Sequence, residues 1–266
     1  MGKKLVQKLL PGLQKLQLPA EMKPTAQGQR AYEIGLEAVD SYKGDPKVLV
    51  DALGTFRSGQ SRPFTCAGIA YVLVAASRES DGSYFPKGLE AAMHWLEKAQ
   101  ETEPDNNLIN MIEALVYSYS GRFDDARLVL DYLHQQGPDH YYLNVAEMVL
   151  AQQQGEVELA GLWYGKAIQA AINVPQKLRL QTRMGDFYLA QNVLDKALVM
   201  FKEAAHFDKD NYQIWHKISL AFYLQNDWEE ALRYNQRVLR MNDYPPARQL
   251  EAKLQEQLNP DSGGVL

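Results

Sequence analysis

The chain has 266 residues, of which 46% are hydrophobic and 23% charged, and its formal net charge is −5. This composition is typical of a folded globular protein and excludes a chain that is disordered throughout. The one cysteine, Cys66, excludes an internal disulfide and a zinc site built on several cysteines. The negative net charge argues against a general nucleic-acid binder, which normally carries a positive excess.

Residues 1–25 are predicted to form a basic amphipathic arm. Five lysines stand there against one acid, Glu21, so the arm carries +4 and the remaining residues sum to −9. Apolar positions between Leu5 and Leu16 give a short helix one apolar face. We expect this arm to dock on its own domain, to stay disordered, or to contact a partner or, weakly, a membrane surface.

The sequence also bears on the compartment of the chain. Lys8 and Pro11 interrupt the apolar core that a secretory signal requires. No stretch approaches the roughly 18 uninterrupted apolar residues of a bilayer-spanning helix. We therefore expect a cytoplasmic protein without a transmembrane segment.

Downstream of the arm the pattern predicts helices in pairs. Residues 26–60 are expected to form a divergent helical pair, and residues 61–246 an array of about five repeats with a loop insertion near 78–88. In this array a small residue recurs with a bulky residue, usually apolar, four positions later, and the small residues are 34, 34, 37 and 34 positions apart. They are Ala92, Ala126, Ala160, Ala197 and Ala231. Such a repeat indicates helix pairs that bury their faces by stacking on neighbouring pairs.

The first half of each repeat agrees with this periodicity. Met184-Gly185-x-x-Tyr188 precedes Ala197, and Trp215-x-x-Ile218-Ser219-x-x-Phe222 precedes Ala231. This pattern resembles the tetratricopeptide repeat (TPR) family, W-x2-L-G-x2-Y followed by A-x3-F. The resemblance implies an all-α fold, a right-handed superhelical solenoid of antiparallel helix pairs whose helices cross closely at small residues such as Gly185. In one unit, 141–174, Glu147 and Met148 replace the apolar-small pair of the pattern.

The end of the chain is predicted to close the array. Residues 247–258 are expected to form a polar capping helix, because solenoids need a polar outer face at their ends. Residues 259–266 are expected to be a flexible tail.

No residues in the sequence form a pattern expected of an active site. None of the five histidines forms an HExxH motif, and no glycine-rich phosphate loop or nucleophile elbow is present. Cys66 lies among apolar neighbours, which favours a buried inert thiol over a nucleophile. We therefore expect no catalytic residues, no metal and no cofactor, and we predict that the chain is not an enzyme.

The family resemblance implies that the first helix of each pair lines a concave groove. The helical period assigns its apolar centre to Ile69, Val72, Leu108, Met111, Ile112, Leu115, Tyr119, Tyr142, Val145 and Val149. Its basic end is assigned to Arg179, Arg183, His216 and Lys217. A register shifted by one residue would place the apolar set in the core instead, and the arm itself is a third candidate to fill the trough.

These features predict a non-catalytic scaffold or adaptor that binds a partner peptide or amphipathic helix in its groove. The alternative is an obligate structural subunit or assembly factor of a multiprotein complex, whose apolar surface is always covered. An RNA-binding repeat protein needs a basic concave surface, and four residues in an acidic chain do not supply one. The sequence leaves the partner and the oligomeric state open.

Overall fold

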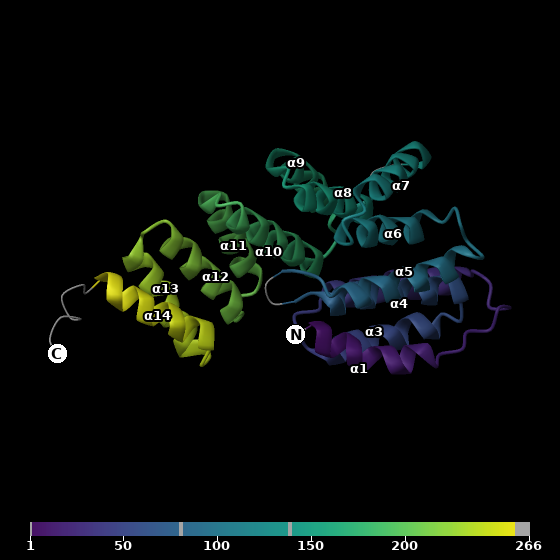
Figure 1. Ribbon diagram of the computed structural model, residues 1–266, viewed down its shortest axis with the longest axis horizontal. Helices are drawn as coiled ribbons and strands as arrows, with labels where there is room; N and C mark the ends of the chain where they lie inside the picture. Colours follow the sequence, from purple (N-terminus) through teal and green to yellow (C-terminus); the bar gives the residue numbers. More distant parts are fainter. Residues whose placement is uncertain (1, 80–81, 138–139, 259–266) are drawn as a thin grey trace. The chain divides into compact units, whose positions relative to one another are not determined.

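The computed structural model describes residues 2–79, 82–137 and 140–258. These residues form fourteen α-helices, and the only β-pairing among them is an isolated bridge between Arg78 and Tyr84 (Figure 1). The prediction of an all-α chain is thus confirmed. The predicted tail 259–266 lies outside the described residues. The helices are α1 (Gly2–Gln14), α2 (Ala26–Asp40), α3 (Pro46–Ser58), α4 (Arg62–Ser77), α5 (Pro86–Gln100), α6 (Asn107–Tyr119), α7 (Phe123–Gln136), α8 (Tyr141–Gln154), α9 (Val157–Ala170), α10 (Val174–Ala190), α11 (Leu194–Phe207), α12 (Tyr212–Leu224), α13 (Trp228–Met241) and α14 (Pro245–Leu258).

Twelve of these helices, α2 to α13, pack as six consecutive hairpins. The turn inside each of the last four hairpins contains one residue with a left-handed backbone. Gly121, Gly155, Asn192 and Asn226 have φ of 73°, 76°, 58° and 61°. Glycine and asparagine are the residues that adopt this conformation most readily, so the sequence itself sets where each first helix stops.

Small residues stand where the helices of a pair cross. All five alanines of the periodic pattern are fully buried. A Cβ atom added to Gly185 would lie 2.5 Å from Cε1 of Phe201, and one added to Gly68 would lie 2.4 Å from Cδ1 of Phe56. The close helix crossing predicted at Gly185 is therefore observed.

The chain divides into two compact units, residues 1–171 and residues 172–266. In the first unit the first helices of successive pairs pack on one another, as α2 on α4, α4 on α6 and α6 on α8. In the second unit the first helix of a pair packs on the second helix of the pair before it, as α12 on α11 and α14 on α13. In the first unit each first helix also packs on the second helix of the pair before it, as α4 on α3, α6 on α5 and α8 on α7, so the units differ in how far first helices pack on one another.

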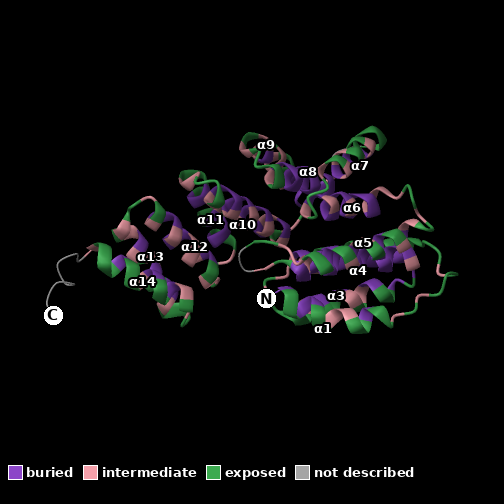
Figure 2. Ribbon diagram, viewed as in Figure 1, coloured by how far each residue is buried: buried purple, intermediate pink, exposed green. Residues whose placement is uncertain are grey.

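The core of the first unit surrounds α4 and α8, which Figure 2 shows as mostly buried. Every residue of α8 from Tyr141 to Ala151 is buried. One enclosed carboxylate there is paired twice: Asp40 on α2 accepts hydrogen bonds from the hydroxyls of Tyr71 at 2.6 Å and Tyr142 at 2.9 Å. The side chain of Asn144 on α8, by contrast, has no hydrogen-bond partner among the described residues. A helix buried on all sides must be covered by several elements.

One of these covering elements is the N-terminal arm, which packs along α4. The amide of Gly2 donates to Glu79, just beyond the end of α4, at 3.0 Å. At the other end, the amide of Arg62 donates to the carbonyl of Met22 at 3.0 Å. The side chain of Val6 on α1 has no exposed surface. The arm therefore follows α4 over its whole length and forms part of the core.

Candidate functional site

The structure places most of the predicted apolar groove inside the first unit. Exposed fractions between 0 and 7% leave these side chains no surface with which to contact a partner. The buried residues are Ile69, Val72, Met111, Ile112, Leu115, Tyr142, Val145 and Val149. Because α4, α6 and α8 pack on one another, residues that would face a groove are enclosed between first helices. For these eight residues the groove prediction is wrong, and the alternative placement in the core is correct.

The two remaining members of the apolar set are half-buried. Tyr119 stacks on Tyr84 with ring centres 4.0 Å apart, which fixes the loop between α4 and α5 against α6. Leu108 lies at the rim of an open polar depression of about 490 Å³ that Gln29 and residues 102–107 line. Neither residue belongs to a continuous apolar surface.

The predicted basic end behaves differently, because it lies in the second unit. Arg179 and Arg183 on α10 and His216 and Lys217 on α12 are all half-buried. They lie on first helices, and α12 packs mainly on α11. Open stacking therefore leaves side chains of α10 and α12 accessible, and we call this surface the α10–α12 face.

An ion pair joins the two helices of this face. Nζ of Lys217 lies 2.6 Å from Oδ1 and 2.8 Å from Oδ2 of Asp186 on α10. The two side chains are 28% and 26% exposed, so the pair is reachable from solvent. With Arg179 and Arg183 on the same helix as Asp186, the α10–α12 face carries three cations and one carboxylate.

His216 adds a polar group in an apolar setting. Its Nδ1 is buried and has no hydrogen-bond partner among the described residues, and its ring meets that of Tyr244 edge-on at 5.1 Å. Burial and then the neighbouring Lys217 lower the pKa of His216 below its usual 6.5. At neutral pH the charge of the α10–α12 face therefore comes from its arginines and lysine.

Catalysis by this chain would need a reactive nucleophile or a bound metal ion. Cys66 is buried, and this burial raises the pKa of its thiol to about 12, so that the nucleophilic thiolate is scarce at neutral pH. No group of three or more His, Cys, Asp and Glu in the described ranges is placed to hold a metal ion. No helix described by the structure is both long and apolar enough to cross a membrane.

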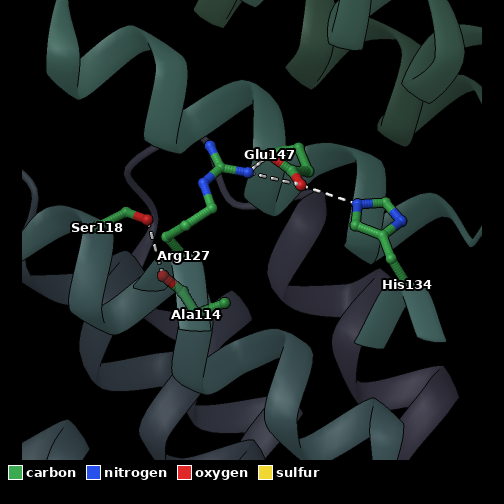
Figure 3. Close-up of polar contacts among 5 residues, drawn as sticks. All are labelled: Ala114, Ser118, Arg127, His134 and Glu147. Atoms are coloured by element: carbon green, nitrogen blue, oxygen red, sulfur yellow. Dashed lines mark hydrogen bonds and ion pairs between the residues drawn. The ribbon is translucent and has the colours of Figure 1, made fainter. Parts of the chain in front are cut away.

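One buried polar cluster was not found from the sequence (Figure 3). Glu147 on α8 is only 1% exposed, and its carboxylate lies 3.0 Å from Nη1 of Arg127 and 2.8 Å from Nε2 of His134, both on α7. The signal was present, because Glu147 breaks the repeat pattern at an apolar position. A buried carboxylate requires cationic or hydrogen-bond-donor partners. Arg127 and His134 supply them from α7, the helix that precedes α8 in the sequence.

Comparisons with known proteins give similar solved structures at low sequence identity. No protein-family model and no curated protein matches the sequence. A tetratricopeptide repeat protein from Parabacteroides merdae ATCC 43184 is 14% identical over 88% of this chain and 88% of its own, with a TM-score of 0.49. MamA (residues 41 to the end) from Desulfovibrio magneticus RS-1 is 16% identical over 58% of this chain and 85% of its own, with a TM-score of 0.48.

A third similar structure is YrrB, described as a TPR protein with an unusual peptide-binding site. It is 15% identical over 85% of this chain and 97% of its own, with a TM-score of 0.47. Likenesses of this size say nothing about a ligand. By its own helices and their spacing, the chain is an all-α repeat protein of stacked antiparallel helix pairs, similar in fold to the tetratricopeptide repeat proteins.

Proposed function

We propose that the chain is a non-catalytic interaction scaffold whose α10–α12 face binds an acidic segment of a partner protein. The observation that carries this proposal is the solvent-accessible ion pair of Lys217 with Asp186, flanked on α10 by Arg179 and Arg183. Cations that are partly desolvated and held by neighbouring groups bind carboxylates more strongly than freely moving surface lysines do.

The form of the ligand follows from the geometry of the face. The ion pair of Lys217 with Asp186 brings together α10 and α12, the first helices of two successive hairpins, and a peptide lying across them meets charges from both. Nζ of Lys217 lies 5.6 Å from the ring centre of Phe201, and Tyr244 meets the ring of His216, so the surroundings of the charges are partly aromatic. An acidic peptide with a few apolar residues fits this combination best.

The test uses a random peptide display library selected on the full chain. We expect acidic peptides to be enriched, and a selected peptide to bind the Arg179→Glu, Arg183→Glu variant at least about tenfold more weakly, since two charge-assisted contacts are lost. The matched control is Lys202→Glu with Lys253→Glu, which makes the same change in net charge at exposed positions of α11 and α14. The proposal fails if the library shows no acidic preference or if both double variants lose affinity equally.

A second variant tests the face through a gain of binding. Asp186→Asn removes the carboxylate that neutralises Lys217, so an acidic peptide should bind several-fold more tightly. A variant that merely damages the fold cannot produce tighter binding. Unchanged or weaker binding by Asp186→Asn would show that Lys217 does not contact the peptide.

A further inference from the structure

A row of lysines occupies the outer side of α1. Lys3, Lys4, Lys8 and Lys15 are exposed, while Leu5, Val6 and Leu13 on the other side are buried. At 100° per residue, Lys4 and Lys8 project within about 40° of one another, and Lys15 follows directly after Gln14, the last residue of α1. We call these three residues the α1 lysine row.

The lysine row has no internal partner. In the described part of the chain, none of its three side chains lies within ion-pair distance of a carboxylate. Residues 2–25 contain a single acid, Glu21, which lies beyond the end of the helix. The positive charge of this surface is therefore not cancelled locally.

The row is also held in a fixed position. A Cβ atom at Gly2 would lie 2.7 Å from the carbonyl oxygens of Ser77 and Arg78, so this end of α1 packs backbone against backbone. The amide of Lys3 donates to Glu79 at 2.6 Å, and Val6 is fully buried. Because its apolar side is already used against α4, α1 presents the lysines without having to leave the core.

The chemistry of the row selects among anionic partners. Residues 2–25 contain no arginine and no aromatic residue, whereas recognition of nucleic acids uses guanidinium forks and stacking rings. Lysine is a mobile point charge, which suits a surface whose negative groups have no fixed arrangement. Leu9 and Leu10 are half-buried and lie toward the side of α1 that carries Leu5 and Val6, so contact with a headgroup falls to the lysines.

The distribution of charge along the chain also favours one orientation of the protein on an anionic surface. The arm carries +4 while the other residues sum to −9. An anionic surface attracts the arm and repels the rest of the chain. The first unit therefore approaches such a surface with the side that carries α1. We propose that the α1 lysine row binds the headgroups of an anionic lipid bilayer while α1 stays docked on α4.

The experiment measures partition of the full chain, tagged at its C-terminal end, onto sedimented vesicles. We expect binding to vesicles of phosphatidylcholine with about one third phosphatidylserine and none to phosphatidylcholine alone. Each lysine near an anionic membrane contributes about fivefold to the partition coefficient, so Lys4→Gln, Lys8→Gln, Lys15→Gln should lower it by about 100-fold. Raising the salt from about 0.1 M to about 0.5 M should weaken the binding similarly.

The matched control replaces three exposed lysines elsewhere, Lys47→Gln, Lys209→Gln and Lys253→Gln, and should retain most of the binding. Circular dichroism and thermal unfolding verify that both triple variants fold. Equal losses in the two variants, or no binding of the wild type to anionic vesicles, would overturn the proposal. Binding to duplex DNA or an acidic peptide, lost with the row, but not to vesicles would overturn it as well.

The docked state is tested by hydrogen exchange. The amides of α1 should remain as protected on vesicles as in solution, because the apolar side of α1 stays on α4. Faster exchange on vesicles would mean that α1 leaves the core to insert. The surface is independent of the α10–α12 face, and Arg179→Glu with Arg183→Glu should leave vesicle binding unchanged.

Discussion

Tyr142 donates a hydrogen bond of 2.9 Å to Asp40, a residue 102 positions earlier in the chain. The second oxygen of the same carboxylate accepts from Tyr71 at 2.6 Å. Asp40 lies on α2, Tyr71 on α4 and Tyr142 on α8, so one buried carboxylate joins three helices of the first unit. Stacking of first helices on one another is thereby fixed by polar groups as well as by apolar packing.

Replacing this carboxylate should destabilise the first unit. Asp40→Ala removes the acceptor of two buried hydroxyls and should lower the free energy of unfolding by about 2–4 kcal/mol. Tyr142→Phe removes one bond and leaves Asp40 the hydroxyl of Tyr71, and should cost about 1 kcal/mol. Urea unfolding followed by circular dichroism measures both. Equal losses of stability in the two variants would show that Asp40 does not accept hydrogen bonds from both tyrosines.

The glycine at the crossing of α3 and α4 should not tolerate a methyl group. Gly68→Ala would place Cβ 2.4 Å from Cδ1 of Phe56, and we expect a loss of about 1–3 kcal/mol from overpacking. Gly54 lies in α3 with open space around its missing Cβ, so Gly54→Ala should stabilise the chain by about 0.5–1 kcal/mol. Thermal unfolding of the two variants should shift in opposite directions.

The buried Glu147 cluster should respond asymmetrically to substitution. Glu147→Leu leaves the side chains of Arg127 and His134, which are 40% and 35% exposed and can turn to water, so stability should change by less than about 1 kcal/mol or rise. Arg127→Ala with His134→Ala instead leaves a carboxylate that is 1% exposed, and should cost about 3 kcal/mol. Chemical denaturation compares the variants, and a larger loss for Glu147→Leu would contradict this account.

The depressed pKa of His216 gives the second unit a pH dependence. The unfolded chain binds a proton at the usual pKa of 6.5 and the folded chain at a lower one. The unfolded state therefore binds more protons as the pH falls, so the stability from neutral His216 is complete above about pH 6.5 and decreases below it. NMR titration should place the pKa of His216 under 6.5, and Lys217→Gln should raise it, because one of its two causes is removed.

The repeat was readable from the sequence because its alanines and turn residues are fixed by local geometry. Helices can cross closely only at small side chains, and left-handed turn positions favour glycine and asparagine, so both recur with the period of the fold. Asn235, which stands where the pattern has a bulky residue, needed the structure. Its side chain is buried and donates to the carbonyl of Ala247 at 2.8 Å, which holds α14 against α13.

The predicted groove failed where the stacking of repeats decides exposure. The helical period indicates which residues share a face, but Ile112 and Arg183 occupy equivalent positions of the repeat, each 14 residues before its alanine. Ile112 on α6 is enclosed because α6 packs on α8. Arg183 on α10 is accessible because the next first helix, α12, packs mainly on α11. The position of the arm did have a sequence signal: α4 is apolar on every side, and such a helix needs a cover on every side.

The arm also sets an order of assembly. Gly2 and Met22 are synthesised first, yet their contacts, Glu79 and Arg62, come 77 and 40 positions later. During synthesis the apolar side of α1 has nothing to bind until α4 and the following loop have left the ribosome. The arm therefore docks only after α4 has been made, and until then the nascent chain exposes an apolar helix that a chaperone can hold.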